Sequence, residues 1–336
     1  MSEVAEKQPS THAELPALGV EAAGDLCTII RQSIGRAVIG QKEVIDQILI
    51  CLLAAGHVLV EGVPGLGKTL LARALAKTFC GQFARIQFTP DLMPTDITGP
   101  VLYDMKKERF TVRRGPVFCH LLLADEINRA PAKTQAALLE VMQEQQVSIE
   151  GHAMDVPAPF MTIATQNPVE QEGTYPLPEA QIDRFLLKIH IDYPSSEEEA
   201  LLVRSVTGNR IGDVLDVSSV TASLDPKQVL QLQQLASDTA VDEAVHRYAI
   251  RLVRATREWP GVHLGAGPRG GIALIRAGRA NALMAGRDFV TPDDLKQMAI
   301  PVLRHRIVLA PELELEGQTA DSVLAQLVEQ VEAPRQ

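Results

Sequence analysis

The chain has 336 residues, 46% of them hydrophobic, and its formal net charge at pH 7 is −10. This length exceeds the size at which single hydrophobic cores stop growing, so we expect two packed domains. The acidic balance argues against a generally basic nucleic-acid-binding surface, although it leaves room for a small basic patch.

The N-terminal segment carries no targeting pattern. Residues 1–19 are rich in Glu, Ala, Pro and Ser without periodicity, which predicts a disordered tail. They lack the basic-then-apolar order of a signal peptide, and no apolar run approaches the roughly 18 residues of a membrane span. We therefore expect a cytoplasmic protein without a membrane span, whose first helices cover residues 21–36 and 42–54.

The next segment, GVPGLGKT, fits the pattern G-x-x-x-x-G-K-[ST] completely. A strand-like run at residues 57–61 precedes it and a helix-like pattern follows, so a chance glycine turn is disfavoured. Glycines let successive N–H groups wrap a phosphate chain, Lys68 can reach the β- and γ-phosphates, and Thr69 offers a hydroxyl to Mg²⁺. The loop predicts binding of a nucleoside triphosphate. The residues assigned to it are Gly62, Val63, Pro64, Gly65, Leu66, Gly67, Lys68, Thr69 and Leu70.

Four further buried strands are predicted along the first 192 residues. Helical patterns such as the one holding Leu138, Val141 and Met142 alternate with them, which favours a parallel α/β sheet of five strands. The strand order cannot be read from the pattern. The four additional strands are expected at residues 85–89, 121–124, 160–165 and 185–191.

Two carboxylates, Asp125 and Glu126, follow the apolar run at residues 121–124. The carboxyl ends of strands are where α/β sheets present ligand-contacting groups. Asp125 is suited to hold Mg²⁺ together with Thr69, and Glu126 to orient or activate the attacking water. An acidic pair that merely starts a helix is the alternative, and the preceding phosphate loop disfavours it.

Two more polar side chains flank the later strands. Asn167 follows the strand at 160–165, where its amide could orient water, although an Asn-Pro pair alone more often marks a turn. Arg184 immediately precedes the last strand, and a lone arginine there is usually a surface ion-pair partner. Both are weak signals by themselves.

After residue 192 the strand-like runs stop and helical patterns take over. We therefore place a domain boundary there, with an α/β core at 20–192 and a smaller all-helical domain at 193–336. One helix has Val245, Tyr248 and Leu252 on a single face, with an arginine stripe opposite that is most simply a solvated face. The stripe consists of Arg247, Arg251 and Arg254.

A second helix in this region is announced by its first residues. Thr291 provides a cap, Pro292 suits the first position, and two acids follow in the first turn. The cysteines are widely spaced among apolar residues without a C-x-x-C pair, so we interpret them as reduced core thiols. They are Cys27, Cys51, Cys80 and Cys119.

Together the motifs resemble those of the MoxR type of AAA+ ATPase, over about residues 38–306. The strings that carry the resemblance are GVPGLGKT, FTPDLMPTDITG, GPVF, LLLADEINRAPAKTQAALLEVMQE, ATQNPVEQEGTYPLPEAQIDRF and GPRGG. The middle strings are long enough to be specific, whereas the phosphate loop alone is shared by many unrelated nucleoside triphosphatases. The resemblance implies an AAA+ core with a five-stranded parallel sheet, two inserted hairpins at residues 98–115 and 147–155, and a helical lid.

The resemblance also implies roles for individual residues. Asp125 matches the Walker B metal ligand, Glu126 the catalytic base and Asn167 the first sensor. Arg184 resembles the arginine finger, which reaches the γ-phosphate of a neighbouring subunit, and Arg269 the second sensor on the lid. The adenine base would pack against Val38, Ile39 and Gly40. Arg129 is expected either to face the adjoining subunit or to be a plain surface residue.

The function implied is that of a chaperone or remodelling ATPase, with ATP and Mg²⁺ as cofactors. It would act in a homo-oligomeric ring, a hexamer by family expectation, and help a protein client such as a metalloenzyme or complex to mature or assemble. Relatives commonly work with a protein bearing a von Willebrand factor A domain with a metal-ion-dependent adhesion site. No D-x-S-x-S segment occurs in this chain, so that partner would be a separate protein.

Two other functions compete with this one. Basic residues around the first hairpin would suit a nucleic-acid remodeller, but Phe110 is the one aromatic residue among them and stacking platforms usually show several. With the acidic net charge, nucleic acid is the weaker expectation. A nucleotide-regulated binding module without turnover conflicts with the presence of both Glu126 and Arg184. The basic residues are Lys106, Lys107, Arg109, Arg113 and Arg114.

Overall fold

The computed structural model describes residues 18–63, 65–106, 108–149, 151–167, 173–207 and 216–334. Most of the predicted N-terminal tail therefore lies outside the described residues. Leu18, at the end of that tail, packs against the hydrophobic core. None of the helices within the described ranges is both long enough and apolar enough to cross a membrane.

The core is a five-stranded parallel sheet with the order β2-β5-β8-β1-β9. This confirms the sheet expected from the sequence and supplies the strand order. The predicted strands are all present, with ends shifted by at most two residues. They are β1 (Val58–Glu61), β2 (Phe83–Gln87), β5 (Leu121–Asp125), β8 (Met161–Gln166) and β9 (Leu187–His190).

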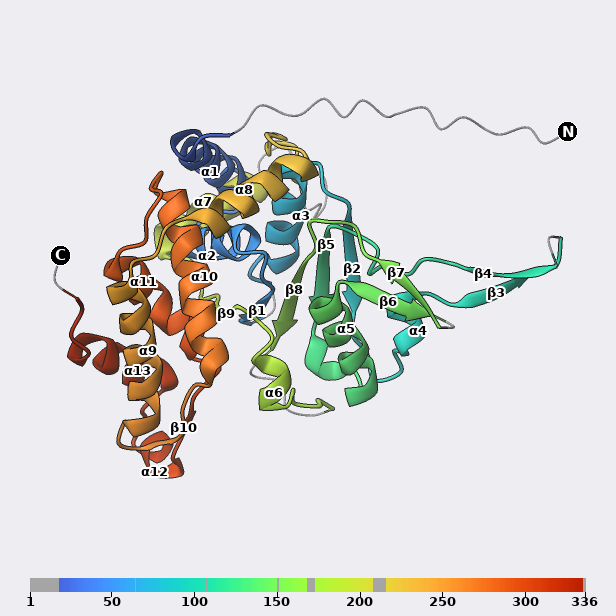
Figure 1. The fold of residues 1–336 in the computed structure, drawn as a ribbon. Coiled ribbons are helices and arrows are strands. Elements are labelled where there is room, and N and C mark those ends of the chain that lie inside the picture. Colours follow the sequence, from blue (N-terminus) through green and yellow to red (C-terminus); the bar gives the residue numbers. More distant parts are fainter. Residues whose placement is uncertain are drawn as a thin grey trace, which may run out of the picture.

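Helices cover both faces of this sheet (Figure 1). Successive side chains of a strand point to opposite faces, so Val58 and Val60 join one buried cluster while Leu59 joins the other. β1, β5 and β8 are therefore buried almost throughout, whereas β2 and β9 alternate apolar with polar residues. The helices of the core are α1 (Val20–Gly35), α2 (Lys42–Leu53), α3 (Lys68–Thr78), α4 (Pro94–Thr98), α5 (Ala132–Glu144) and α6 (Glu179–Ile182), with a 3-10 turn at Ile127–Arg129.

Two hairpins are inserted into the core, as the resemblance implied. The first pairs β3 (Val101–Asp104) with β4 (Arg109–Val112), and it projects far from the body (Figure 1). The second pairs β6 (Gln146–Ile149) with β7 (His152–Asp155). Lys107, expected in the basic cluster, lies outside the described residues.

The C-terminal part is a helical lid, with one difference from the all-helical expectation. β10 (Val262–Leu264) and β11 (Val308–Leu309) form a short antiparallel ladder. Runs of two and three residues are too short for a periodic pattern to reveal. The helices are α7 (Ser196–Thr207), α8 (Pro226–Asp238), α9 (Glu243–Glu258), α10 (Pro268–Met284), α11 (Pro292–Leu303), α12 (Pro311–Leu315) and α13 (Ala320–Gln330).

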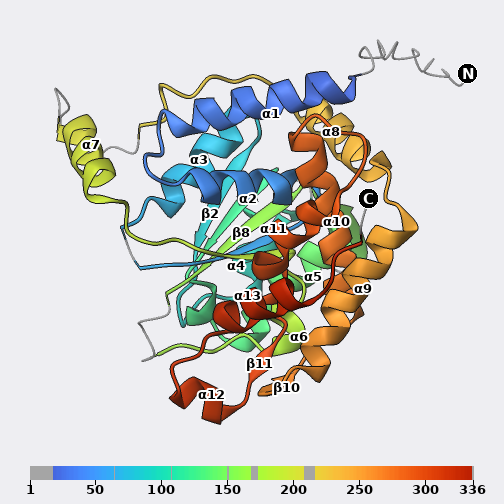
Figure 2. The same cartoon turned by 90° about the vertical axis from the view of Figure 1, so that its left-hand side faces the viewer.

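The lid and the sheet share one hydrophobic cluster. Lid residues such as Leu252 and Leu274 belong to the same buried set as Ile45 of α2 and Val60 of β1. Figure 2 shows α10 and α11 lying across the α1–α2 side of the molecule. The boundary expected after residue 192 stays a prediction, because buried contacts run continuously across it.

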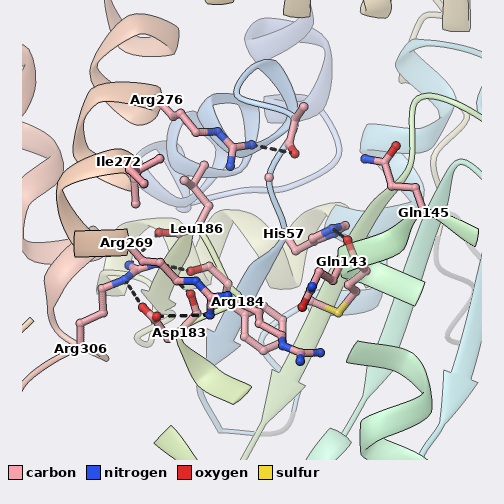
Figure 3. Close-up of a pocket in the computed structure, with 15 residues that line it drawn as sticks. His57, Gln143, Gln145, Asp183, Arg184, Leu186, Arg269, Ile272, Arg276 and Arg306 are labelled. Atoms are coloured by element: carbon pink, nitrogen blue, oxygen red, sulfur yellow. Dashed lines mark hydrogen bonds and ion pairs between the residues drawn. The ribbon is translucent and has the colours of Figure 1, made fainter. Parts of the chain in front are cut away.

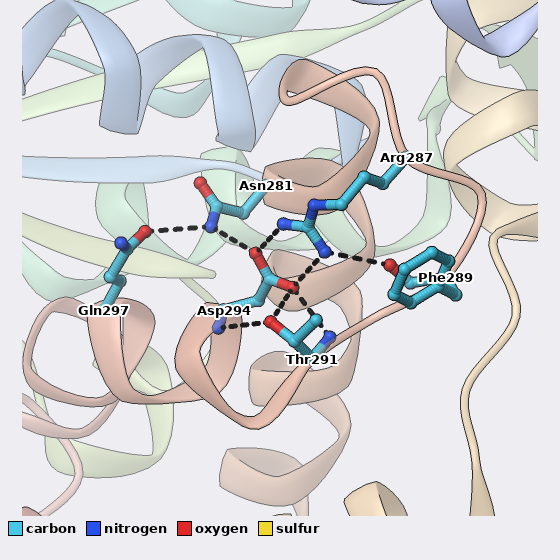
Figure 4. Close-up of polar contacts among 6 residues, drawn as sticks. All are labelled: Asn281, Arg287, Phe289, Thr291, Asp294 and Gln297. Atoms are coloured by element: carbon cyan, nitrogen blue, oxygen red, sulfur yellow. Dashed lines mark hydrogen bonds and ion pairs between the residues drawn. The ribbon is translucent and has the colours of Figure 1, made fainter. Parts of the chain in front are cut away.

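The predicted start of α11 is confirmed and is part of a polar network (Figure 4). The hydroxyl of Thr291 accepts the N–H of Asp294, whose carboxylate in turn accepts the N–H of Thr291 at 2.7 Å. The guanidinium of Arg287 donates to both carboxylate oxygens of Asp294, at 2.6 and 2.9 Å. Asp294 is buried, and these donors satisfy its charge.

Three of the four cysteines are buried thiols, as expected, but Cys80 is exposed. It follows the end of α3 with a φ of 52°, so the chain turns there and leaves the side chain at the surface. The prediction that Cys80 is a core residue is therefore wrong. All four thiols are free.

The close approach of α1 to the loop after α10 gives a stability prediction. A Cβ added at Gly24 would lie 2.9 Å from backbone atoms of Gly286, so Gly24→Ala should cost about 1–3 kcal/mol through forced separation of the two segments. Gly35→Ala, at the exposed end of α1, meets nothing within 4 Å and should stabilise slightly. Urea unfolding midpoints would measure both, and an unchanged midpoint for Gly24→Ala would contradict the packing.

Candidate functional site

The predicted nucleotide-binding residues gather at the carboxyl edge of the sheet. β5, β8 and β1 are adjacent and parallel, so the residues that follow them share one edge. These residues are the loop starting at Gly62, the pair Asp125 and Glu126, and Asn167. The structure thus brings together groups that are up to about one hundred residues apart in sequence.

The phosphate loop has the backbone that its glycines require. Gly65 and Gly67 have φ values of 88° and 78°, in the left-handed region that other residues rarely adopt. A Cβ at Gly62 would lie 2.7 Å from the carbonyl oxygen of Ile191. α3 begins at Lys68, so its N-terminal N–H groups face the loop, as anion binding requires. Pro64 lies outside the described residues.

Lys68 lies among carboxylates at this edge. Its ammonium group donates to the carbonyl oxygen of Gly62. Burial lowers the pKa of Lys68 below its ordinary value, and the charges of Asp125 and Glu126 act in the opposite direction. The ammonium therefore lies between the loop and the two acids, where a triphosphate would bind.

Asp125 is held from two sides. One carboxylate oxygen accepts the hydroxyl of Thr165 at 2.6 Å, and the other accepts the guanidinium of Arg85 at 2.7 Å. Both partners come from neighbouring strands, β8 and β2. Mg²⁺ bound with a nucleotide takes few protein ligands, mostly oxygen atoms. A carboxylate fixed at the same edge as the loop that carries Thr69 fits that donor chemistry, so Asp125 and Thr69 could hold Mg²⁺.

Glu126 lies in a turn whose backbone conformation differs from that of the preceding strand β5. Its φ of 56° is left-handed, and its N–H donates to the hydroxyl of Thr165 at 2.9 Å. Its carboxylate accepts the amide of Gln87 at 2.8 Å and lies 3.3 Å from the guanidinium of Arg129. Arg129 therefore contacts Glu126 directly. Whether it also faces an adjoining subunit stays a prediction.

A pocket beside the phosphate loop could hold the base of the nucleotide. It is lined by Gly62, Val63 and residues 190–193. The predicted adenine segment lies next to it, because the side-chain amide of Gln41 donates to the carbonyl oxygen of Asp192 at 3.0 Å. Within that segment Val38 is buried, and Gly40 has a φ of 77°.

Arg184 and Arg269 lie elsewhere, in a pocket of about 370 Å³ between the sheet and the lid (Figure 3). Arg184 donates to the carbonyl oxygen of Leu139 in α5 at 2.8 Å. Arg269, at the start of α10, lies 3.5 Å from the carboxylate of Asp183. The structure therefore brings these two arginines together, but not with the phosphate loop.

Arg306 lines this pocket and holds the turn at Asp183–Phe185 through hydrogen bonds. Its buried guanidinium donates to the carboxylate of Asp183 at 2.8 Å and to the carbonyl oxygen of Phe185 at 2.7 Å. Asp183 thus accepts from Arg306 on one oxygen and faces Arg269 with the other. This contact sets the turn that carries Arg184.

The arginine pocket lies at the amino edge of the sheet. Its wall includes His57, directly before β1, and Leu186, directly before β9, whose N–H donates to the carbonyl oxygen of His57 at 2.8 Å. Burial lowers the pKa of His57 to about 4, so its neutral ring accepts the N–H of Thr162 and donates to the carbonyl oxygen of Met142. The length of β1, about 13 Å at 3.3 Å per residue, separates this pocket from the phosphate loop.

Sequence reasoning missed several residues that support the site. Arg85 and Gln87 alternate with buried Ile86 along β2, a period-2 signal that was available. Thr165 and Arg306 gave no such signal, because a buried threonine in a strand and an arginine in a helical region are both common in proteins. Only their contacts show what they hold.

Comparison with known proteins identifies the chain. Residues 57–187 match the model of the ATPase family associated with various cellular activities, and residues 254–327 match the AAA lid domain. Chaperone MoxR1 of Mycobacterium tuberculosis is 43% identical over 338 residues, covering 96% of this chain and 87% of the relative. The chain belongs to the MoxR family of AAA+ ATPases.

Two further similarities span nearly whole chains. The uncharacterized protein YeaC of Bacillus subtilis is 44% identical, covering 91% of this chain and 94% of the relative. The crystal structure of a candidate ATPase from Cytophaga hutchinsonii has a TM-score of 0.86 and 40% identity, covering 94% and 97% of the two chains. The protein is therefore a nucleotide-binding MoxR-family ATPase and chaperone with an AAA+ core and a helical lid.

The bridging hydroxyl of Thr165 gives a test of the site. Thr165→Val removes the donor to Asp125 and the acceptor for the N–H of Glu126, so ATP turnover should fall about 10- to 100-fold, as for other groups that orient metal ligands. Thr162→Val is the matched control, because its buried hydroxyl in the same strand has no hydrogen-bond partner in the described part of the chain. Steady-state phosphate release measures both, and equal turnover would contradict the assignment.

Proposed function

We propose that this ATPase works as a head-to-tail ring in which each active site is shared by two subunits. The observation that carries the proposal is the position of Arg184 and Arg269 at the amino edge of the sheet, whereas Lys68 lies at the carboxyl edge. Neither arginine is near the phosphate loop of its own chain. A second copy, turned so that its arginine pocket meets this loop, would complete the site, and repetition of that contact closes a ring. We expect six subunits.

Within one subunit, the carboxyl edge would bind Mg-ATP. The phosphate loop and Lys68 bind the triphosphate, while Asp125 and Thr69 hold Mg²⁺, which neutralises charge on the phosphates when bound. Glu126 takes the proton of the attacking water, and Asn167 orients that water. Arg85 and Thr165 keep Asp125 in place, and Gln87 does the same for Glu126.

The neighbouring subunit would supply positive charge. Arg184 stabilises the charge that develops on the γ-phosphate, which in related systems changes turnover by about 10³ to 10⁵. Arg269, carried by the lid, links nucleotide state to lid position through the same pocket. Its pairing with Asp183 is half-exposed and so is weak enough to exchange for a phosphate.

We further propose a protein client rather than a nucleic acid. The β3–β4 hairpin exposes a set of apolar side chains, and the rings of Tyr103 and Phe110 meet edge to face at 5.2 Å. Exposed apolar surface of this kind suits protein contact. The exposed apolar residues are Leu102, Tyr103, Met105 and Phe110. The client would be a metalloenzyme or complex under assembly, delivered by a separate protein with a von Willebrand factor A domain, as family membership suggests.

Mixing two inactive variants tests the shared site. Arg184→Ala keeps an intact phosphate loop, and Lys68→Ala keeps an intact arginine pocket. Each alone should lose at least 10³-fold in turnover, whereas mixed rings should recover a clear fraction of wild-type activity at interfaces that pair the two intact halves. Phosphate release across mixing ratios measures the recovery.

The control mixture is Lys68→Ala with Glu126→Gln. Both changes fall in the same half of the site, so no interface combines two intact halves and activity should stay absent. Recovery in this control, or none in the first mixture while both variants still assemble, would rule out sharing between subunits.

A nucleotide-dependent capture experiment tests the client class. Glu126→Gln should retain ATP binding without turnover and hold the ATP state, whereas Lys68→Ala should not reach it. With Mg-ATP in native lysate, the first variant should enrich an adhesion-site protein or an immature metalloenzyme relative to the second. Enrichment of nuclease-sensitive material without protein would favour a nucleic-acid remodeller instead.

A further inference from the structure

The lid carries an apolar groove that the proposed chemistry does not use. It lies between α9 and α10, has a volume of about 540 Å³, and includes Val253 and Ile275 in its wall. Two of its large apolar side chains, Ile250 and Ile272, are 55% and 60% exposed. We call it the α9–α10 groove. An exposed apolar surface bordered by polar groups is typical of a docking site.

The charge of the α9–α10 groove opposes that of the chain as a whole. The chain has a net charge of −10, yet the groove is lined by four arginines and a histidine, and by no acidic residue within the described part of the chain. The basic residues are His246, Arg254, Arg257, Arg276 and Arg279. The interpretation of Arg254 as part of a solvated face is therefore incomplete, because Arg254 borders the apolar α9–α10 groove. The groove suits an apolar segment that carries negative charge.

The chain itself contains a segment of that chemistry. α7 spans 12 residues, none of which is buried, and begins with three consecutive glutamates, Glu197 to Glu199. Its apolar residues include Leu201 and Val203, which are 55% and 54% exposed. Figure 2 shows α7 standing away from the body of the molecule. A helix with this much exposed apolar surface lacks a packing partner among the residues that the structure describes.

α7 and the α9–α10 groove lie on different halves of the proposed interface. α7 follows the nucleotide edge, because Glu198 would contact a Cβ placed at Gly40 in the predicted adenine segment. The groove instead adjoins the arginine pocket, with which it shares Ile272 and Arg276. In Figure 2 α7 and α9 are on opposite sides of the molecule. The contact that brings an arginine pocket to a neighbour's nucleotide edge would therefore also bring the groove toward that neighbour's α7.

We propose that α7 of one subunit docks into the α9–α10 groove of the next copy of this chain. The inference rests on the proposed head-to-tail ring and adds a second, non-catalytic contact to it. The apolar side chains of α7 fill the groove, and its glutamates face the arginines. α7 follows residues 190–193 of the pocket beside the phosphate loop, and Arg269 lies in the first turn of α10. The docking would therefore link occupancy of one site to the lid of the next subunit.

Assembly measurements on exposed residues test this contact. In a Glu126→Gln background with Mg-ATP, Ile250→Asp and Leu201→Asp should each raise the protein concentration for half-maximal assembly by about tenfold or more, since each places a charge in an apolar contact. Ile29→Asp is the matched control, because Ile29 is 49% exposed on α1 and should have no effect. Sedimentation velocity measures assembly, and thermal unfolding verifies that all three variants fold.

Cross-linking provides a readout that loss of stability cannot imitate. With Cys80 replaced by serine, Val203→Cys and Ile250→Cys in one chain should give a ladder of covalent oligomers with a short bis-maleimide, whereas either cysteine alone should not. A cross-link within one chain, or rings without a ladder, would overturn the docking while leaving the shared active site in place. Failure of the Glu126→Gln protein to assemble at all would instead overturn the ring, and the docking with it.

An outside partner in the groove is the remaining outcome that would overturn the proposal. In that case Ile250→Asp would leave assembly unchanged but reduce capture of an acidic protein in the lysate experiment, and Leu201→Asp would affect neither. The two aspartate variants are expected to behave alike only if their side chains belong to the same contact.

Discussion

The parallel pairing of β5, β8 and β1 is the constraint on which the rest of the structure depends. It places the ends of three strands side by side, so that the phosphate loop, the acidic pair and Asn167 meet although they are far apart in sequence. The hydroxyl of Thr165 then fixes the acids relative to the strand, because it donates to Asp125 and accepts from the N–H of Glu126. A small shift in the register of β8 would remove both contacts.

The same sheet separates the two kinds of charge. Acids and Lys68 lie at the carboxyl edge, and a cluster of arginines lies at the amino edge around Asp183. Arg306 is the residue that makes the second cluster possible, because its buried guanidinium ties the turn before β9 to the lid. The lid and the sheet also share one hydrophobic cluster. Arg184 and Arg269 therefore both line the pocket where the lid meets the sheet.

Two exposed surfaces take no part in the proposed chemistry, and their charges are opposite. α7 is acidic and apolar, while the α9–α10 groove is basic and apolar. Their positions follow from the fold, since one continues from the nucleotide edge and the other from the arginine pocket. The proposed head-to-tail arrangement would bring the two surfaces together without any change of structure within a subunit.

Local periodicity or a contiguous motif was enough to predict the strands, the phosphate loop, the acidic pair, the cap of α11 and the family. The prediction for Cys80 was wrong and the short β10–β11 ladder was not predicted, because a single turn or a run of two or three residues leaves no periodic pattern. The folded structure was needed to establish the strand order, the partners of Asp125 and Glu126, and the position of Arg184 and Arg269 at the edge opposite Lys68. These depend on contacts between segments far apart in the chain, and no local pattern encodes which distant segment will lie beside which.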